Sequence, residues 1–249
     1  MATRFYLSTA AAPYTPPTLR GTWADTTLST NVWELSRTRS GANTAVARAE
    51  TSASNNFKVL LHRHVSGPLA GGAVTTSNSI THTQARQEDA TAANMTVQIA
   101  VWVTVGDSDT VRGFLIDPFA GATEFATTMT AFSYTLTMDN AFTIQPGDRL
   151  VIELGYNAAN TSTTSRTGTV RAGGTAADLA TSGTTGVTTN SPWVEFDAGL
   201  DSALAAGAAP VSGTAAALLD ALSSTAAGVV TSPTSAIRRS FARPRAANF

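Results

Sequence analysis

The sequence of 249 residues contains no cysteine, and charged residues make up only 13% of it. Without cysteine the chain forms no disulfide, no thiolate zinc site and no cysteine nucleophile. Lys58 is the only lysine, so arginine supplies almost all of the positive charge, and the formal net charge is −1. We therefore expect no general attraction of its surface to nucleic acid or to an anionic membrane.

Long hydrophobic runs are also missing. The opening MATRFYLSTAAAPYTPP lacks the basic and apolar regions of a secretion signal. The Ala-rich run at 198–230 is interrupted by Asp201, Pro210 and Asp220, well before it reaches the ~20 apolar residues of a membrane span. We expect a soluble protein that does not enter a membrane and is not exported by the ordinary route.

Catalytic motifs are absent as well. The sequence has no GxSxG nucleophile elbow and no GxxxxGK[ST] phosphate loop. Glu153 and Glu195 fall at positions predicted to face outward, and nothing pairs them as glycosidic cleavage requires. We predict that the chain is not an enzyme and has no catalytic residue, cofactor or metal.

What the sequence does have is period-two alternation of apolar and polar residues. In the segment NMTVQIAVWVTV (94–105), the apolar residues at 95, 97, 99, 101, 103 and 105 face one way, and Trp102 falls on the opposite, polar face. Similar strands are predicted, separated by turn signals, at 57–65, 110–116, 132–138, 142–144, 149–156, 168–172 and 192–196, with weaker ones at 3–7, 31–36 and 42–50. So many antiparallel strands predict an all-β, jelly-roll-like sandwich.

The pattern changes after residue 198, which gives three predicted parts: a sandwich domain at 1–198, short Ala-rich helices or linker at 199–223, and an extended arm at 224–249. Leu200 and Leu204, and then Leu218 and Leu222, are four residues apart, as on one face of a helix. The arm has no periodicity and carries arginines without a single acid, which is typical of a chain that does not fold alone.

Three histidines raise the question of a metal site. His62 and His64 are two residues apart in a predicted strand and so share a face, and His82 lies on a later strand. The alternation of 57–65 turns both outward beside Lys58, which favours solvated strand residues over metal binding. The turn GDSD (106–109) resembles the start of a calcium loop, but the residues that follow do not continue the ligand pattern, so a plain hairpin turn is favoured.

Trp102 and the arm are the predicted contact residues. Trp102 either stacks on a sugar ring or packs under a loop or another subunit. The arm either neutralises phosphates, docks on a neighbouring protein or is a solvated terminus; apolar residues interleaved with its arginines favour protein docking. The predicted docking residues are Ile237, Arg238, Arg239, Phe241, Arg243, Arg245 and Phe249.

Several linked motifs resemble one known family. They are TRFYL followed by a Pro-containing linker and TWAD (22–25), then PGDRLVIELGY, NTSTTSRTGTVRAGG, DLA (178–180) and SPWVEF. Together they resemble β-sandwich virion proteins of tailed bacteriophages and prophages of high-GC bacteria. The motifs span residues 3–196, and the segment after Gly199 lies outside the shared pattern.

The resemblance implies a structural component of a virion, of the minor tail, fibre or head-decoration type, and it brings no catalytic residues. Its expected partners are other phage virion proteins and further copies of the chain, with a trimer as one suitable arrangement, but not a nucleic acid or a membrane. The alternative is a carbohydrate-binding module that attaches a phage to a host glycan, with Trp102 exposed at its contact surface.

Overall fold

A computed structural model describes residues 2–16, 18–51 and 56–207, all within one compact unit, Met1–Ala209. The second unit, Pro210–Phe249, lies outside the described residues. The strands are β1 (Thr3–Ala11), β2 (Val32–Ser36), β3 (Thr44–Ala49), β4 (Phe57–Ser66), β5 (Gly72–Val74), β6 (Ser79–Glu88), β7 (Met95–Thr104), β8 (Val111–Glu124), β9 (Thr130–Thr137), β10 (Phe142–Ile144), β11 (Arg149–Ala158), β12 (Thr167–Ala172), β13 (Ser182–Gly183) and β14 (Trp193–Phe196). The helices are short: η1 (Thr91–Ala93), η2 (Ala198–Leu200) and α1 (Asp201–Leu204).

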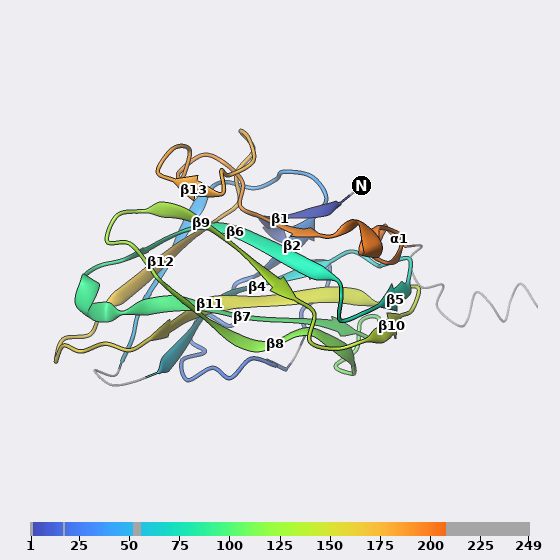
Figure 1. Cartoon of the computed structure of the whole chain (residues 1–249), viewed down its shortest axis with the longest axis horizontal. Helices are drawn as coiled ribbons and strands as arrows, with labels where there is room; N and C mark the ends of the chain where they lie inside the picture. Colours follow the sequence, from blue (N-terminus) through green and yellow to red (C-terminus); the bar gives the residue numbers. More distant parts are fainter. Residues whose placement is uncertain (1, 17, 52–55, 208–249) are drawn as a thin grey trace, which may run out of the picture. The chain divides into compact units, whose positions relative to one another are not determined.

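Most of these strands form one long sheet that packs against itself. Its order is β13-β9-β6-β14-β1-β2-β4-β11-β7-β8, with β12 attached to β6 and β3 attached to β12 (Figure 1). Phe5 and Phe196 from one half share the main core with Ile99 and Ile152 from the other, so the two halves face each other as layers. The predicted all-β, jelly-roll-like sandwich is therefore confirmed; β2 and β4 are parallel neighbours in an otherwise antiparallel sheet.

The alternation along β7 decides where its side chains lie. Ile99, Val101 and Val103 enter the main core, while Ala100 and Trp102 lie on the opposite face, in a cluster with Val65 and Val151. The strand is nevertheless buried on both sides. Something other than the facing layer must therefore cover the second face.

The cover is a segment that we call the N-terminal strap, residues 12–16 and 18–31. Arg63 holds it by donating from Nη1 to the Pro16 carbonyl (2.6 Å) and from Nη2 to the Ser29 carbonyl (3.0 Å). The carboxylate of Glu153 accepts hydrogen bonds from the Trp23 indole and the Gly21 amide, both at 2.6 Å. Glu153 thus faces outward from the sandwich as predicted, but the strap buries it completely.

The predicted outward orientation of His62 and His64 is wrong, and a β-bulge is the reason. Along β11, Leu154 pairs with His62 but the next residue, Gly155, pairs with Leu60. The extra residue on β4 shifts its alternation by one position. His62 and His64 therefore share the inward side of Leu154, and Val65 is on the strap side instead.

The predicted Ala-rich helices are only partly described. Helix α1 is a single turn, and its Ala203 and Leu204 are buried in the main core together with Leu200. No helix in the described part of the chain is long and apolar enough to span a membrane. The rest of the predicted helical segment, 208–223, and the whole arm lie outside the described residues.

Candidate functional site

The candidate site lies where the two ends of the long sheet meet without pairing. Strand β8 ends the sheet on one side, and β9, with the two-residue β13, ends it on the other. Backbone bonds close the gap on either side: beyond β9 the Asp139 amide donates to the Leu115 carbonyl of β8 (2.9 Å), and beyond β8 the Glu88 amide of β6 donates to the Ala126 carbonyl (3.0 Å). Between these bonds, residues 119–123 of β8 and 132–136 of β9 do not pair with each other. We call these two stretches the seam.

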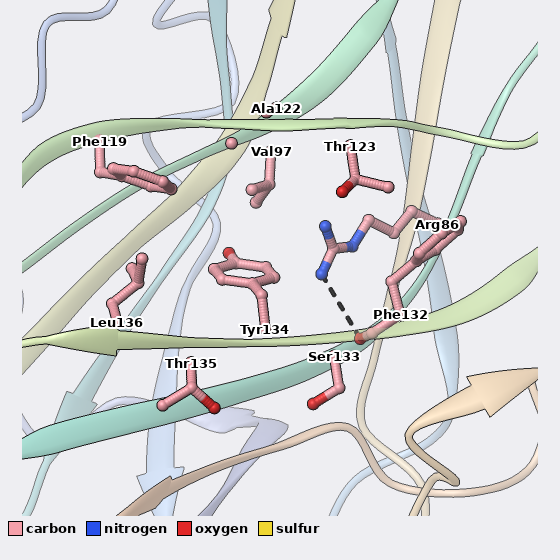
Figure 2. Close-up of a pocket in the computed structure, with 11 residues that line it drawn as sticks. Arg86, Val97, Phe119, Ala122, Thr123, Phe132, Ser133, Tyr134, Thr135 and Leu136 are labelled. Carbon is pink, nitrogen blue, oxygen red and sulfur yellow. Dashed lines mark hydrogen bonds between the residues drawn. The ribbon is translucent and has the colours of Figure 1, made fainter.

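A pocket of about 170 Å³ opens in the seam (Figure 2). Its apolar lining comes mainly from large side chains. These are Val97, Phe119, Phe132 and Leu136. Ser133 and Thr135 contribute little polarity, because their hydroxyls pair with Thr83 (2.9 Å) and Thr81 (2.8 Å) on β6. The polar side chains left to face the pocket are Arg86, Thr123 and Tyr134.

Arg86 is the unusual member of this set, because it is a buried cation without an anionic partner. Its side chain comes from the inward face of β6 and is only 2% exposed. Its one hydrogen bond to a carbonyl is long, 3.5 Å from Nη2 to Phe132, and Nε has no partner. Within the described residues no carboxylate lies at ion-pair distance from it.

Aromatic rings replace the missing anion. The guanidinium carbon lies 4.9 Å from the centre of the Tyr134 ring and 5.6 Å from those of Phe125 and Phe132. Such cation–π contacts compensate part of the cost of burying a charge. Burial lowers the pKa of Arg86 below the usual arginine value.

A row of buried polar side chains continues from Arg86 into the core. His82 Nδ1 and the Tyr134 hydroxyl are 2.9 Å apart, and Gln84 Nε2 lies 3.1 Å from His62 Nε2. The rings of His62 and His64 meet edge to face at 4.8 Å. Burial lowers the pKa of all three histidines, that of His64 to about 4. They are therefore neutral at physiological pH.

The three histidines do not form a metal site in this structure. One ring nitrogen of each is buried without a partner: His62 Nδ1, His64 Nε2 and His82 Nε2. Among the described residues, however, no three histidine or acidic side chains converge in a way that could hold a metal ion. The interpretation that the sequence favoured, solvated strand residues, is wrong, because each of the three is at most 1% exposed.

Two carboxyl groups lie beyond Arg86 in the direction away from the histidines. Glu88 is two residues further along β6, and its Oε2 accepts a hydrogen bond from the Met95 amide (2.9 Å). Burial and the neighbouring carboxyl of Glu124 raise the pKa of Glu88 to about 7. The otherwise unpartnered Oε1 of Glu124 gains a donor when the two carboxyls share a proton.

Trp102, the predicted sugar contact, is not exposed. Only 1% of its surface is accessible, and it packs with Tyr14 and Phe114 beneath the N-terminal strap. The carbohydrate-binding alternative requires Trp102 to be exposed, and this prediction is wrong. In the structure Trp102 packs under a loop. The strap was not anticipated because it has no periodicity.

The remaining predicted sites are placed as follows. The aspartates of the GDSD turn bind arginines: Asp107 pairs with Arg149, and Asp109 with Arg20 (3.1 Å). Glu195 is half-buried and pairs with Arg4. The predicted docking residues of the arm, Ile237, Arg238, Arg239, Phe241, Arg243, Arg245 and Phe249, lie outside the described residues.

Arg86 is the residue that sequence reasoning missed. The segment SITHTQARQE alternates, so that Ile80, His82, Gln84, Arg86 and Glu88 share one face. That row contains more polar than apolar residues, which by itself indicates a solvent-exposed face. Only packing against the opposite layer, where Gln84 of β6 meets His62 of β4, places this row inside, as the burial of these side chains shows.

Comparison with known proteins gives structural neighbours only. No protein-family model matches the chain, and no curated protein matches its sequence. Three solved structures illustrate the likeness. A selenomethionine-labelled α-amino acid ester hydrolase shares 10% identity over 78% of this chain and 36% of its own, with a TM-score of 0.43. A VP2 subviral particle of infectious bursal disease virus shares 13% over 66% of this chain and 36% of its own (TM-score 0.29), and a CBM4 shares 12% over 51% and 88% (TM-score 0.23).

These neighbours correct one expectation. The prediction that the chain is not an enzyme is contradicted, because the first structure named is a hydrolase. A sandwich of this kind occurs in enzymes and non-enzymes alike, and fold does not decide function. The prediction is dropped.

Proposed function

We propose that this chain is a structural component of a tailed-bacteriophage virion, in the tail, a fibre or the capsid decoration, and that it assembles through its arm and its sheet edges. The observation that carries the proposal is where the family-like motifs lie. They meet in two polar clusters that hold the sandwich together.

The first cluster joins TWAD to PGDRLVIELGY. Trp23 of the former donates its indole N–H to Glu153 of the latter. Asp25 accepts from Arg48 Nε (2.8 Å) and is itself buried. Both contacts fasten the N-terminal strap to the sheet, so these motif residues have a role in the scaffold.

The second cluster joins TRFYL to DLA and SPWVEF. Arg4 donates from Nε to Glu195 (2.9 Å), and Tyr6 donates its hydroxyl to Asp178 (3.0 Å). The Trp193 indole donates to the Leu179 carbonyl (2.9 Å). The motifs on which the resemblance to the phage family rests therefore contribute contacts that build a rigid module, and a rigid module suits a protein used as a part of a particle.

The proposed assembly relies on the division of the chain at 198 and 223. The sandwich supplies the module, the Ala-rich segment the connection, and the Arg-rich arm the attachment to other virion proteins or to further copies of the chain. Ile237, Phe241 and Phe249 are the proposed apolar anchors, because burial of aromatic and aliphatic side chains dominates the free energy of protein docking.

Incorporation into particles tests the proposal. Antibodies against the purified sandwich should decorate virions released from a lysogen that carries this gene, as seen by immunogold electron microscopy. Absence of the chain from purified virions, with free chain in the same lysate, would contradict the virion role.

Two arm variants separate the modes of attachment. Replacing Ile237, Phe241 and Phe249 by Ser should abolish incorporation, while the circular dichroism of the sandwich stays unchanged. Replacing the four arginines by Gln should weaken incorporation less. The reverse order, together with strong salt dependence, would favour phosphate binding over protein docking.

A further inference from the structure

We propose that the seam pocket is a binding site for a small carboxylate with an apolar body, and that Arg86 is its counter-ion. The inference does not depend on the virion role, because it rests on one buried cation and on the cavity into which it points.

The charge of Arg86 is the first argument. Buried ions in proteins are normally paired, since removing a charge from water costs several kcal/mol. Arg86 is 2% exposed, and its contacts are a long hydrogen bond to the Phe132 carbonyl, the Tyr134 hydroxyl and three aromatic rings. It has no carboxylate partner in the described part of the chain. Figure 2 shows its guanidinium pointing away from β6 toward Tyr134 and the pocket interior. Nε of Arg86 is buried without a hydrogen-bond partner, and its N–H is a donor from which a bound carboxylate would accept.

The lining gives the second argument, because it excludes a bare inorganic anion. Val97, Phe119 and Leu136 present hydrocarbon opposite the guanidinium, and phosphate or sulfate has nothing to bury against it. A ligand with one anionic end and one apolar end satisfies both sides of the pocket. Among the described residues Arg86 is the only cation that lines it, so a monoanion is the matching charge.

The volume limits the size of the ligand. The pocket measures about 170 Å³, and an apolar cavity of about 150 Å³ accepts one benzene ring. Benzoate or a branched aliphatic acid such as 3-methylbutanoate has this size. A planar carboxylate also matches the guanidinium, which can donate two parallel N–H bonds to it.

Thr123 supplies a further polar contact at the mouth of the pocket. Its side chain lies on β8 opposite Arg86, and no hydroxyl bond of Thr123 to another described residue is present. The hydroxyl of Tyr134 is engaged by His82 at 2.9 Å, so it is less available to the ligand. Arg86 and Thr123 are thus the two groups expected to hold the carboxylate.

The test is a titration of the full chain with benzoate, in which binding is measured by isothermal titration calorimetry and by saturation-transfer NMR. Benzamide is the neutral probe of equal shape, and inorganic phosphate is the anion without an apolar body. We expect saturable benzoate binding at one site per chain, with benzamide about tenfold to a hundredfold weaker, since a charge-assisted bond is lost. Phosphate should not compete at equal concentration.

Three variants make the test specific. Arg86→Met removes the guanidinium but keeps an unbranched apolar side chain, and should reduce benzoate affinity by the same factor as the change to benzamide. Leu136→Trp leaves Arg86 in place but fills the cavity, and should abolish benzoate binding. This variant tests the proposal if Arg86→Met does not fold. Arg39→Met, a control at a surface arginine paired with Asp178 outside the pocket, should bind benzoate as the wild type does.

The outcomes that overturn the proposal are equally defined. No saturable binding of benzoate to the wild type would refute it, as would equal affinity for benzoate and benzamide, which would make the pocket merely apolar. Benzoate affinity equal to that of the wild type in folded Arg86→Met or Leu136→Trp would place the ligand elsewhere. Competition by phosphate at equal concentration would show an unspecific anion site.

Discussion

The buried histidines predict a specific loss of stability in acid, and His64 gives it a magnitude. Burial lowers the pKa of His64 to about 4, against about 6.5 in the unfolded chain. Because the pKa is lower in the folded state, the contribution to stability is fully present above pH 6.5 and is lost as the pH falls toward 4. At pH 5 the unfolded chain binds nearly one proton at this site and the folded chain almost none, which amounts to about 2 kcal/mol.

The assay is urea unfolding of wild type and His64→Leu at pH 8 and at pH 5. The variant should lose about 2 kcal/mol less than the wild type over this range, whatever the difference between them at pH 8, where the variant lacks the 3.3 Å contact of Nδ1 with the Glu34 carbonyl. His62 and His82 act in the same direction, because their pKa values are lowered too. Glu88 acts in the opposite direction, but it is present in both proteins and so cancels in the comparison.

Two results would refute this reasoning. Equal losses of unfolding free energy in wild type and variant would mean that His64 does not resist protonation. A His64 ring proton whose NMR shift titrates near pH 6.5 in the folded protein would mean that water reaches the ring. Either result would also remove the basis for treating the histidine row as a dry part of the core.

Further predictions concern the seam and the strap. In Glu88→Gln the free energy of unfolding should fall less between pH 6 and pH 9 than in the wild type. The raised pKa of Glu88, about 7, makes its contribution to stability present below pH 4.5 and lost as the pH rises through 7. Equal changes in wild type and variant in urea unfolding at pH 6 and 9 would contradict the shared proton. Trp102→Ala should cost about 3–5 kcal/mol, as for a large buried side chain, whereas an exposed sugar platform would cost little; urea unfolding decides. Glu153→Leu should make the N-terminal strap sensitive to trypsin at Arg20, since the Trp23, Gly21 and Arg20 donors lose their acceptor; resistance equal to that of the wild type would show that the Arg63 bonds suffice, and Glu195→Leu is the control at a half-buried carboxylate.

The seam explains why a pocket with a buried cation forms in this sandwich. A sheet that packs against itself but does not close leaves two end strands whose side chains must still fill the gap between the layers. Here β6 directs Arg86 toward that gap, and aromatic side chains cover part of the charge without neutralising it.

The sequence alone determined the class of the fold, because period-two alternation is a local property that needs no knowledge of neighbours. The segment at 94–105 became β7, and even the weakly predicted segments at 3–7, 31–36 and 42–50 became β1, β2 and β3. Local patterning also identified which residues of β7 share a face, since no bulge on that strand exchanges the two faces.

Tertiary structure alone decided which faces are covered and by what. One extra residue opposite Gly155 turned His62 and His64 inward, and the strap, which has no periodic signal, buried Trp102 and Glu153. The alternation along β6 by itself indicates a solvent-exposed polar face. The opposite layer covers that face in the structure. Burial depends on contacts between residues far apart in the chain, so the only described cation of the pocket, Arg86, could not be distinguished from an ordinary surface arginine before the strands were paired.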